Sequence, residues 1–355
     1  MDNLKVTPFA NIALEDPFFD SLRTNYEGFD DWFRRKASAG EVALVYYDGA
    51  TLLDFLYLKD ENEALQLDGL TLPPKKRLKV GTFKIERRGT NRGERFMKRI
   101  LDVAIIKDIP EIYVTMFDDT GELQHLRSFF EQYGFSEVGR KSHPNGRSES
   151  VLVRDMSVHT GDIVQDYPFV DRTQGKKYLL AIKPDYHTKL FPDSILKTEH
   201  YDILQDVSPT NSINKIYICW MRGVDQLKYG DKLIIYRTTD YQGPAQYRSV
   251  ATSLCTVSEV KTIRDFSSID EFVRYTNRYS IFNETELRRW YHTKPDFVVF
   301  KVVYNLAFQK KVIRKELIEQ VGLQKDVYWG FMPLTEMQFN DILNLGNADG
   351  RYIIH

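Results

Sequence analysis

The passage from residue 78 to residue 107 joins a strand, a short basic loop and an amphipathic helix. Residues 78–85 alternate between two faces as a β-strand does, whereas residues 94–107 repeat their apolar side chains at 3.6-residue spacing. The apolar stripe on this helix is wide, as expected where a helix packs on a sheet. This part of the chain is therefore predicted to form an α/β layer. The stripe consists of Phe96, Met97, Ile100, Leu101, Val103 and Ala104.

The flanking segments extend the same layer to about residue 156. Helices are expected over residues 17–39 and 125–133, and Gly134 is a suitable terminator for the second. The sum is an α/β (α+β) fold, a mixed sheet flanked by helices. The further strands are expected over residues 41–47, 51–58 and 111–117, with a closing hairpin over residues 135–140 and 148–154.

A length of 355 residues favours two domains over one core. Periodicity lapses over residues 157–175, which we expect to link a domain over residues 1–156 to one over residues 176–355. The second domain is richer in strands, broken by short helices, and this spacing suggests a small, partly open β-barrel. Its strands are expected over residues 178–182, 215–220, 232–237, 249–260 and 297–304. Helix-start signals with a capping residue and Glu or Gln three positions later occur at Ser268/Glu271, Asn283/Glu286 and Thr335/Gln338.

Composition excludes several classes of protein. The formal net charge is −1, so any attraction for phosphates must come from a local cluster. Two cysteines cannot build a disulfide framework, and the seven histidines show no metal-binding spacing, so no metal is expected. No stretch approaches the roughly 18 apolar residues of a membrane helix, and we expect a cytoplasmic protein without a membrane partner. A Gly-x-Ser-x-Gly elbow and a Walker loop are also absent.

The loop after residue 85 is the most basic part of the sequence. Residues 75–99 contain eleven Lys and Arg against Glu86 and Glu94. A helix N-terminus attracts anions, glycines allow close backbone approach, and arginines add charge-assisted contacts. A diphosphate-bearing cofactor therefore fits this loop. A solvated basic helix that follows a glycine-containing turn fits the same residues, and charge and glycine alone do not separate the two readings.

The order of elements resembles the GNAT acetyltransferases over residues 41–154. The family's cofactor motif, Arg/Gln-x-x-Gly-x-Gly/Ala, reads here Arg88-Gly89-Thr90-Asn91-Arg92-Gly93, and its Tyr-x-x-x-Gly-Phe pattern corresponds to residues 130–135. The resemblance implies acetyl-CoA as cofactor, with pantetheine and carbonyl held by the strand backbone near residues 83–85. The cofactor-binding residues it implies are Phe83, Ile85, Arg88, Gly89, Thr90, Asn91, Arg92 and Gly93.

Two positions depart from the family pattern. Asn91 replaces the first glycine, and asparagine tolerates positive φ better than most residues. Phe130 replaces a tyrosine that protonates the departing thiolate in many family members. Tyr133 is a candidate substitute for that acid, and Glu86 is a candidate base for the acceptor amine. The alternative readings are a core position for Tyr133 and a counter-charge to neighbouring arginines for Glu86.

The second domain resembles the ASCH/PUA-like barrels, which are associated with RNA and modified nucleotides. The resemblance rests on residues 211–217, 230–237 and 250–260, and the Gly-x-Lys-x-x-Glu-x-Arg pattern of the hydrolytic members is absent around Lys215. Binding rather than cleavage is therefore implied, and a PIN-type ribonuclease is an implied partner. The alternative is that the aromatics below lie in the core and the arginines are ordinary surface charges. The nucleic-acid-binding candidates are Lys215, Arg222, Arg237, Arg248, Arg278, Tyr279 and Trp290.

Three functions remain open from the sequence. The leading hypothesis is an acetyl-CoA-dependent N-acetyltransferase whose substrate is RNA-linked, such as a charged tRNA or a modified base. The second is a non-catalytic, antitoxin-like regulator that binds nucleic acid and keeps only cofactor or partner binding. The third is an acetyltransferase for proteins or small amines whose second domain serves assembly.

Overall fold

The computed structural model describes residues 4–86, 91–194, 212–240, 242–294 and 296–354. The chain divides into two compact units, Met1–His159 and Thr160–His355. The division lies within the stretch expected to be a linker, but the residues after it pack as part of the second unit. Asn305 Nδ2 donates to the carbonyl of Pro168, and β10 (Val170–Asp171) pairs in parallel with β17 (Ile353–Ile354).

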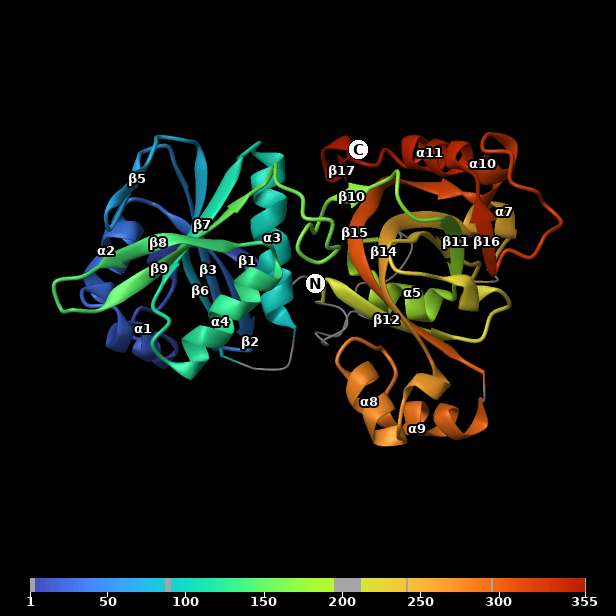
Figure 1. Cartoon of the computed structure of the whole chain (residues 1–355), viewed down its shortest axis with the longest axis horizontal. Helices are drawn as coiled ribbons and strands as arrows, with labels where there is room; N and C mark the ends of the chain where they lie inside the picture. The colour runs from blue at the N-terminus through green and yellow to red at the C-terminus, as the bar shows by residue number, and fades with distance from the viewer. Residues whose placement is uncertain (1–3, 87–90, 195–211, 241, 295, 355) are drawn as a thin grey trace. The chain divides into compact units, whose positions relative to one another are not determined.

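The first unit is built on a seven-stranded sheet in the order β1-β2-β3-β6-β7-β9-β8 (Figure 1). The pair β6–β7 is parallel and the other five pairs are antiparallel. The strands are β1 (Leu4–Pro8), β2 (Val42–Asp48), β3 (Thr51–Glu61), β6 (Arg77–Ile85), β7 (Glu111–Met116), β8 (Ser136–Ser142) and β9 (Ser148–Asp155), and a small separate hairpin joins β4 (Leu65–Leu67) to β5 (Leu70–Leu72). The predicted strands are confirmed, and β1 is an addition.

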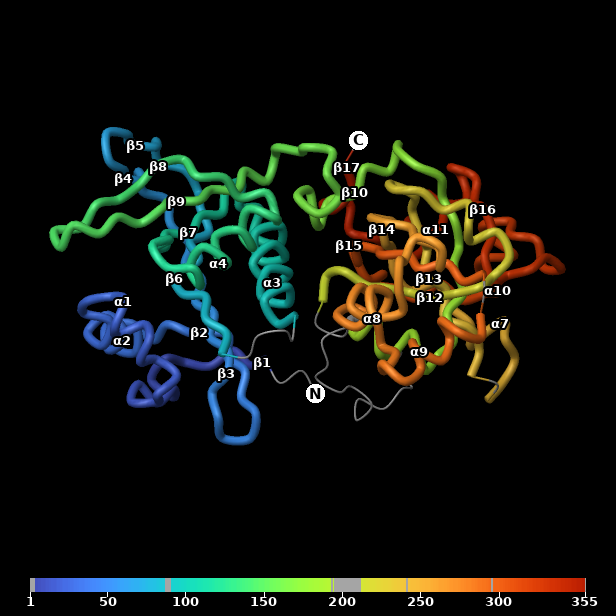
Figure 2. Tube along the Cα trace, turned by 60° about the horizontal axis from the view of Figure 1, so that its bottom comes forward, coloured from blue at the N-terminus to red at the C-terminus, as the bar shows by residue number. Residues whose placement is uncertain are grey.

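Helices cover both faces of this sheet (Figures 1 and 2). Lys84 of β6 reaches Ser21 in α1 (Asp20–Asn25), which marks the face covered by α1 and α2 (Phe29–Ser38). The neighbouring residue Phe83 points to the opposite face and packs on α3 (Arg92–Ile106) and α4 (Gly121–Gln132). The single helical region expected over residues 17–39 is broken at Gly28, whose φ of 74° suits glycine.

The second unit is built on a six-stranded sheet in the order β12-β15-β14-β13-β11-β16. The pair β11–β13 is parallel and the others are antiparallel, so the chain contains two mixed sheets. Closure of this sheet into a barrel stays a prediction. The strands are β11 (Lys177–Ile182), β12 (Asn214–Cys219), β13 (Lys232–Arg237), β14 (Val250–Thr262), β15 (Val298–Ile313) and β16 (Phe331–Leu334).

The helix starts predicted in the second unit are confirmed. Ser268, Asn283 and Thr335 each cap a helix by accepting a hydrogen bond from the backbone N–H three residues later. The capped helices are α8 (Ile269–Asn277), α9 (Glu284–Thr293) and α11 (Glu336–Leu345), and the other α-helices in the described part of this unit are α5 (Pro184–Leu190), α7 (Ala245–Arg248) and α10 (Arg314–Glu319).

Candidate functional site

The two parallel strands of the first unit, β6 and β7, are paired along only part of their length. β6 pairs with β7 from Arg77 to Val80, opposite Glu111 to Val114, and β6 then continues to Ile85. Over residues 81–85, β6 is paired only with β3 among the described strands. Backbone groups on the β7 side of this segment, which we call the free edge of β6, are therefore available for an extended ligand.

Helix α3 begins shortly after the free edge ends. Asn91 caps it in the left-handed conformation, with φ 53°, and its carbonyl accepts from the N–H of Glu94 at 3.0 Å. The prediction that Asn91 supports a positive-φ turn is thus confirmed. Gly93 lies in the first turn, where an added Cβ would stand 3.4 Å from Phe129 Cζ. Arg88, Gly89 and Thr90 lie outside the described residues, so their predicted phosphate contacts stay predictions.

Arg92 has a different position from the one expected of a phosphate ligand. Its Nη1 lies 3.0 Å from both carboxylate oxygens of Asp54 in β3, and its guanidinium covers the ring of Tyr46 at 4.7 Å. Both partners are buried. A buried guanidinium needs such a carboxylate, because its own desolvation is otherwise uncompensated. We therefore correct the assignment of Arg92 from ligand to structural anchor of the α3 start.

An aromatic cluster lies behind the free edge. The ring of Phe83 packs on those of Phe96, Phe129 and Phe130 at centroid distances of 5.4–5.9 Å. Phe130 is fully buried, and so is Tyr133, whose ring packs on Phe129 at 5.3 Å. Tyr133 is accordingly a core residue, and its position gives no support to the predicted role of proton donor.

Glu86 follows directly after β6 and is exposed. Its Oε1 lies 2.9 Å from Lys84 Nζ, and its backbone N–H donates to the carbonyl of Leu53 at 2.9 Å. The carboxylate is accessible to a substrate, but it already neutralises a lysine. The arrangement favours the counter-charge reading, with Lys84 as one partner; Arg87 and Arg88, the partners that the sequence suggested, lie outside the described residues. A role for Glu86 as base stays a prediction.

The nucleic-acid-binding candidates of the second unit do not form one surface. Lys215, Arg237, Tyr279 and Trp290 are buried, with 1–9% of their surface exposed. Arg248 is held by Asp240, with its Nε 2.5 Å from one carboxylate oxygen. Arg222 and Arg278 are exposed. The alternative of a core position holds for Tyr279 and Trp290, which belong to a hydrophobic cluster with residues of α8 and α9. The nucleic-acid contacts of the candidate set stay predictions.

Sequence reasoning missed a cluster of buried polar side chains in the second unit. His187 of α5 lies 2.8 Å, through Nε2, from the hydroxyl of Thr252. The hydroxyl of Ser194 lies 2.9 Å from that of Tyr304, over whose ring Lys215 Nζ stands at 5.9 Å. We call these five residues the buried polar cluster. The segment that carries His187 looked ordered in the sequence, but one histidine among apolar neighbours has no distinctive spacing.

Two cationic side chains interact with His187 of the buried polar cluster. Burial, and after it the nearby charges of Arg237 and Lys311, lower the pKa of His187 from 6.5 to about 3. Its Nδ1 is buried without a hydrogen-bond partner among the described residues. A neutral imidazole whose Nδ1 has no partner among the described residues can accept a hydrogen bond from a ligand.

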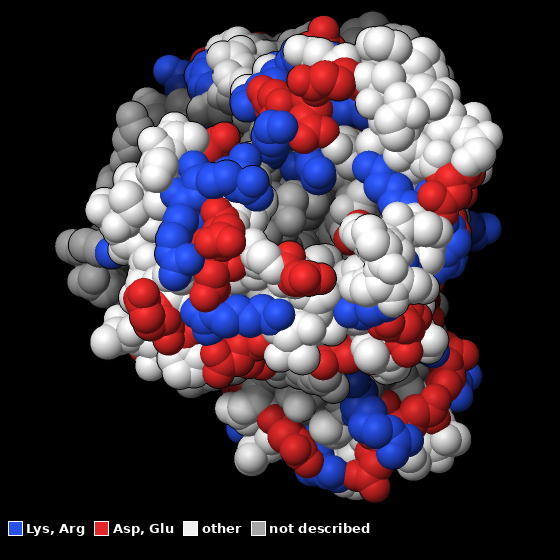
Figure 3. Space-filling model, turned by 90° about the vertical axis from the view of Figure 1, so that its left-hand side faces the viewer, with Lys and Arg blue, Asp and Glu red and all other residues white. Residues whose placement is uncertain are grey.

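On the face in Figure 3, Lys and Arg side chains are interleaved with Asp and Glu. Among the described residues, no group of three or more His, Cys, Asp or Glu side chains could hold a metal ion, and no helix is long and apolar enough to cross a membrane.

No protein-family model and no curated protein matches this chain. Among solved structures, the chain is similar to an ASCH protein from Zymomonas mobilis, at 10% identity and a TM-score of 0.34, over 49% of this chain and 96% of that one. It is also similar to an aminoglycoside 6'-acetyltransferase type Ii, at 17% identity and a TM-score of 0.31, over 44% of this chain and 99% of that one. A third similar structure is an N-acetyltransferase from Staphylococcus aureus Mu50, at 10% identity and a TM-score of 0.32, over 43% of this chain and 97% of that one. The similar structures thus include an ASCH protein and acetyltransferases, each covering about half of the chain, and likenesses this distant concern the fold alone.

Proposed function

We propose that this chain is an acetyl-CoA-dependent N-acetyltransferase whose second unit recognises RNA or a modified nucleotide. The observation that carries the proposal is that the pairing of β6 with β7 ends before β6 does, beside the start of α3. An extended pantetheine chain would pair with the free edge of β6 as an added strand does. The first turn of α3 would then face the diphosphate with backbone N–H groups and the positive end of the helix dipole.

Acetyl-CoA supplies an acetyl group activated as a thioester. A backbone N–H on the free edge, near Phe83 and Ile85, would donate to the carbonyl oxygen as negative charge develops there. This contribution requires no particular side chain, so the replacement of the family's tyrosine by Phe130 does not remove it. The chain's own part in catalysis is accordingly to position the thioester and stabilise its oxyanion.

The buried position of Phe130 and Tyr133 supports the second candidate, a regulator that binds the cofactor without turnover. Neither ring presents a proton to a departing thiolate, so the thiolate would have to leave without a protein acid at these positions. The two candidates share the cofactor site and differ in catalysis alone.

The buried polar cluster supports the proposal for the second unit. A free imidazole nitrogen, two hydroxyl groups and a lysine next to an aromatic ring suit a base and a phosphate held together. The partner that we propose is therefore RNA or a modified nucleotide, and binding of a PIN-type ribonuclease remains a separate prediction.

Titration calorimetry with acetyl-CoA, followed by an acetylation screen of amines with and without total tRNA, tests the proposal. Cofactor binding with RNA-dependent turnover supports it. Binding without turnover supports the regulator, and turnover that ignores RNA supports an amine or protein acetyltransferase. Absence of acetyl-CoA binding would remove the cofactor site and the enzyme with it.

A further inference from the structure

A histidine and a glutamate meet across the hairpin that joins β8 to β9. His143 Nε2 lies 2.9 Å from Glu149 Oε2, and the two side chains are 39% and 10% exposed. A carboxylate can only accept, so Nε2 carries the hydrogen and Nδ1 carries the lone pair. No described residue forms a hydrogen bond with Nδ1. The pair is thus an oriented, accessible imidazole base backed by a buried carboxylate.

The pair stands at the carboxyl end of β7. Phe117 follows the last residue of β7, and its ring centroid lies 5.5 Å from that of His143. The ring of Phe117 also packs on that of Tyr26, at a centroid distance of 5.2 Å, and lies under the guanidinium of Arg147, at 3.7 Å. This end of β7 lies beyond Val114, the last residue of β7 that is paired with β6. The base therefore belongs to the same opening between strands that we assign to the thioester.

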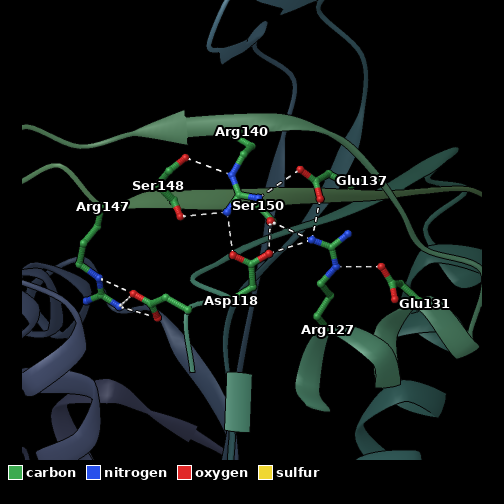
Figure 4. A network of polar contacts seen from close by, with 9 residues as sticks. Asp118, Arg127, Glu131, Glu137, Arg140, Arg147, Ser148 and Ser150 are labelled. Atoms are coloured by element: carbon green, nitrogen blue, oxygen red, sulfur yellow. Dashed lines mark hydrogen bonds and ion pairs between the residues drawn. The ribbon is translucent and has the colours of Figure 1, made fainter. Parts of the chain in front are cut away.

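Two ion-pair networks hold this region in place (Figure 4). Arg147 binds both carboxylate oxygens of Asp119 and donates through Nη1 to the carbonyl of Asn25 at 3.0 Å, which joins the hairpin to the end of α1. Asp118 accepts from Arg127, Arg140 and Ser150 at 2.7–2.8 Å. The hairpin, the segment after β7 and the middle of α4 are thereby fixed to one another, as a preorganised catalytic group requires.

We propose that His143, oriented by Glu149, is the base that removes the proton from the acceptor amine. The inference rests on the proposed acetyltransferase function and assigns its missing base. The amine nitrogen forms a bond to the thioester carbonyl carbon, and its proton passes to Nδ1 of His143. The carbon–sulfur bond then breaks, and the thiolate of CoA takes up the proton from the imidazolium directly or through water. The products are the acetylated amine and CoA thiol.

The pH dependence of this base will reflect several neighbours. Glu149 forms the hydrogen bond described above, and Asp68, on the turn between β4 and β5, is close enough to interact with His143 as well. Among the described residues, Glu149 and Asp68 interact with His143 itself, whereas Arg147 and Tyr26 lie against the neighbouring ring of Phe117 and Asp119 binds Arg147.

The test is steady-state and pH-dependent kinetics of the full chain with acetyl-CoA and three amine probes, glycinamide, spermidine and total aminoacylated tRNA. The variant His143→Gln keeps an N–H donor for Glu149 but has no lone pair that titrates. We expect kcat to fall by about a hundredfold and the acidic limb of the kcat/KM profile to disappear, with acetyl-CoA affinity unchanged. The variant Glu149→Gln should lower kcat less and move that limb. The matched control is His125→Gln, an exposed histidine of α4.

Thermal unfolding and acetyl-CoA titration of each variant separate loss of a base from loss of the fold. Folded His143→Gln protein that retains the kcat and acidic limb of the wild type overturns the assignment of the base and leaves the proposed function standing. Wild-type protein that binds acetyl-CoA and acetylates none of the three probes argues against the enzyme itself, and this inference fails with it.

Discussion

Arg92 and Asp54 form a buried ion pair that ties the start of α3 to the middle of β3. Arg92 Nη1 lies 3.0 Å from each oxygen of Asp54, and the two side chains are 3% and 2% exposed. The pair fixes the helix end at which we place the diphosphate. The ion pair also engages the side chain of Arg92, an arginine that the sequence motif alone would predict to bind the cofactor.

Replacing Arg92 with methionine removes the guanidinium that contacts the buried carboxylate of Asp54. We expect Arg92→Met to lower the free energy of unfolding by about 3 kcal/mol, which urea denaturation near neutral pH would measure. The matched control is Arg34→Met, which breaks the exposed pair with Asp31 and should cost less than about 1 kcal/mol. Equal losses in the two variants would show that burial of the Arg92 pair has no energetic consequence.

Gly93 tests the cofactor site. Gly93→Asp places a carboxylate in the first turn of α3, so we expect acetyl-CoA to bind at least about tenfold more weakly, or roughly 1.4 kcal/mol, by calorimetry. The control Gly93→Ala adds a Cβ 3.4 Å from Phe129 without charge, and it should retain affinity because alanine favours the helix. Unchanged affinity in Gly93→Asp removes the site assignment, and equal losses in both variants assign the effect to bulk.

The local elements of this chain were predictable because their signals are local. The alternation of residues 78–85 and the apolar stripe of residues 94–107 gave β6 and α3, and three capping residues gave three helix starts. Tyr133 shows where the same reasoning was misapplied. It lies three positions after Phe130 on the apolar face of α4, a spacing that already favours the core.

The site partners were not predictable, because they are set by tertiary packing. Asp54 meets Arg92 across 38 residues, and no sequence pattern links them. His143 was part of a turn in the sequence, and only the register of β8 on β9 brings it to Glu149. Lys215 was predicted to bind nucleic acid, and no local signal in the sequence indicated that every residue of β12 is buried.

Asp118 should make the first unit sensitive to acid. Burial raises its pKa, but hydrogen bonds from Arg140, Ser150 and Arg127 outweigh burial and lower the pKa to about 2, from 3.8 for an isolated side chain. A depressed carboxyl pKa contributes stability that is complete above about pH 4 and is lost as pH falls through about 2. We therefore expect the unfolding free energy to fall less steeply in Asp118→Asn than in the wild type over this range. Parallel denaturant-derived curves for the two proteins would contradict the assignment.

His187 should make the second unit sensitive at milder pH. Its pKa falls from 6.5 to about 3 on folding, so below about pH 6.5 the unfolded chain binds a proton that the folded chain does not. Its neutral form therefore contributes stability that is complete above pH 6.5 and declines as pH falls toward 3. We expect His187→Gln to lose this dependence between about pH 7 and 4, while the exposed control His125→Gln keeps it. A wild-type slope in His187→Gln would indicate that the histidine titrates normally.

A substitution of Lys215 tests whether the buried polar cluster binds a ligand or is part of an ordinary core. Its ammonium is buried beside Tyr304 in β15, and Lys215→Met keeps most of the volume while removing the charge. If this charge holds an RNA phosphate or a base, the affinity for fluorescently labelled total tRNA should fall by at least about tenfold, or roughly 1.4 kcal/mol.

The control for that measurement is Lys228→Met, an exposed lysine of the same unit, which should weaken binding by less because solvent screens its charge. Thermal unfolding of both variants shows whether the fold persists. A folded Lys215→Met protein that binds tRNA as the wild type does would place RNA recognition away from the buried polar cluster. The exposed arginines Arg222 and Arg278 would then be the next positions to vary, since they are the members of the predicted set that a large ligand can reach without any rearrangement.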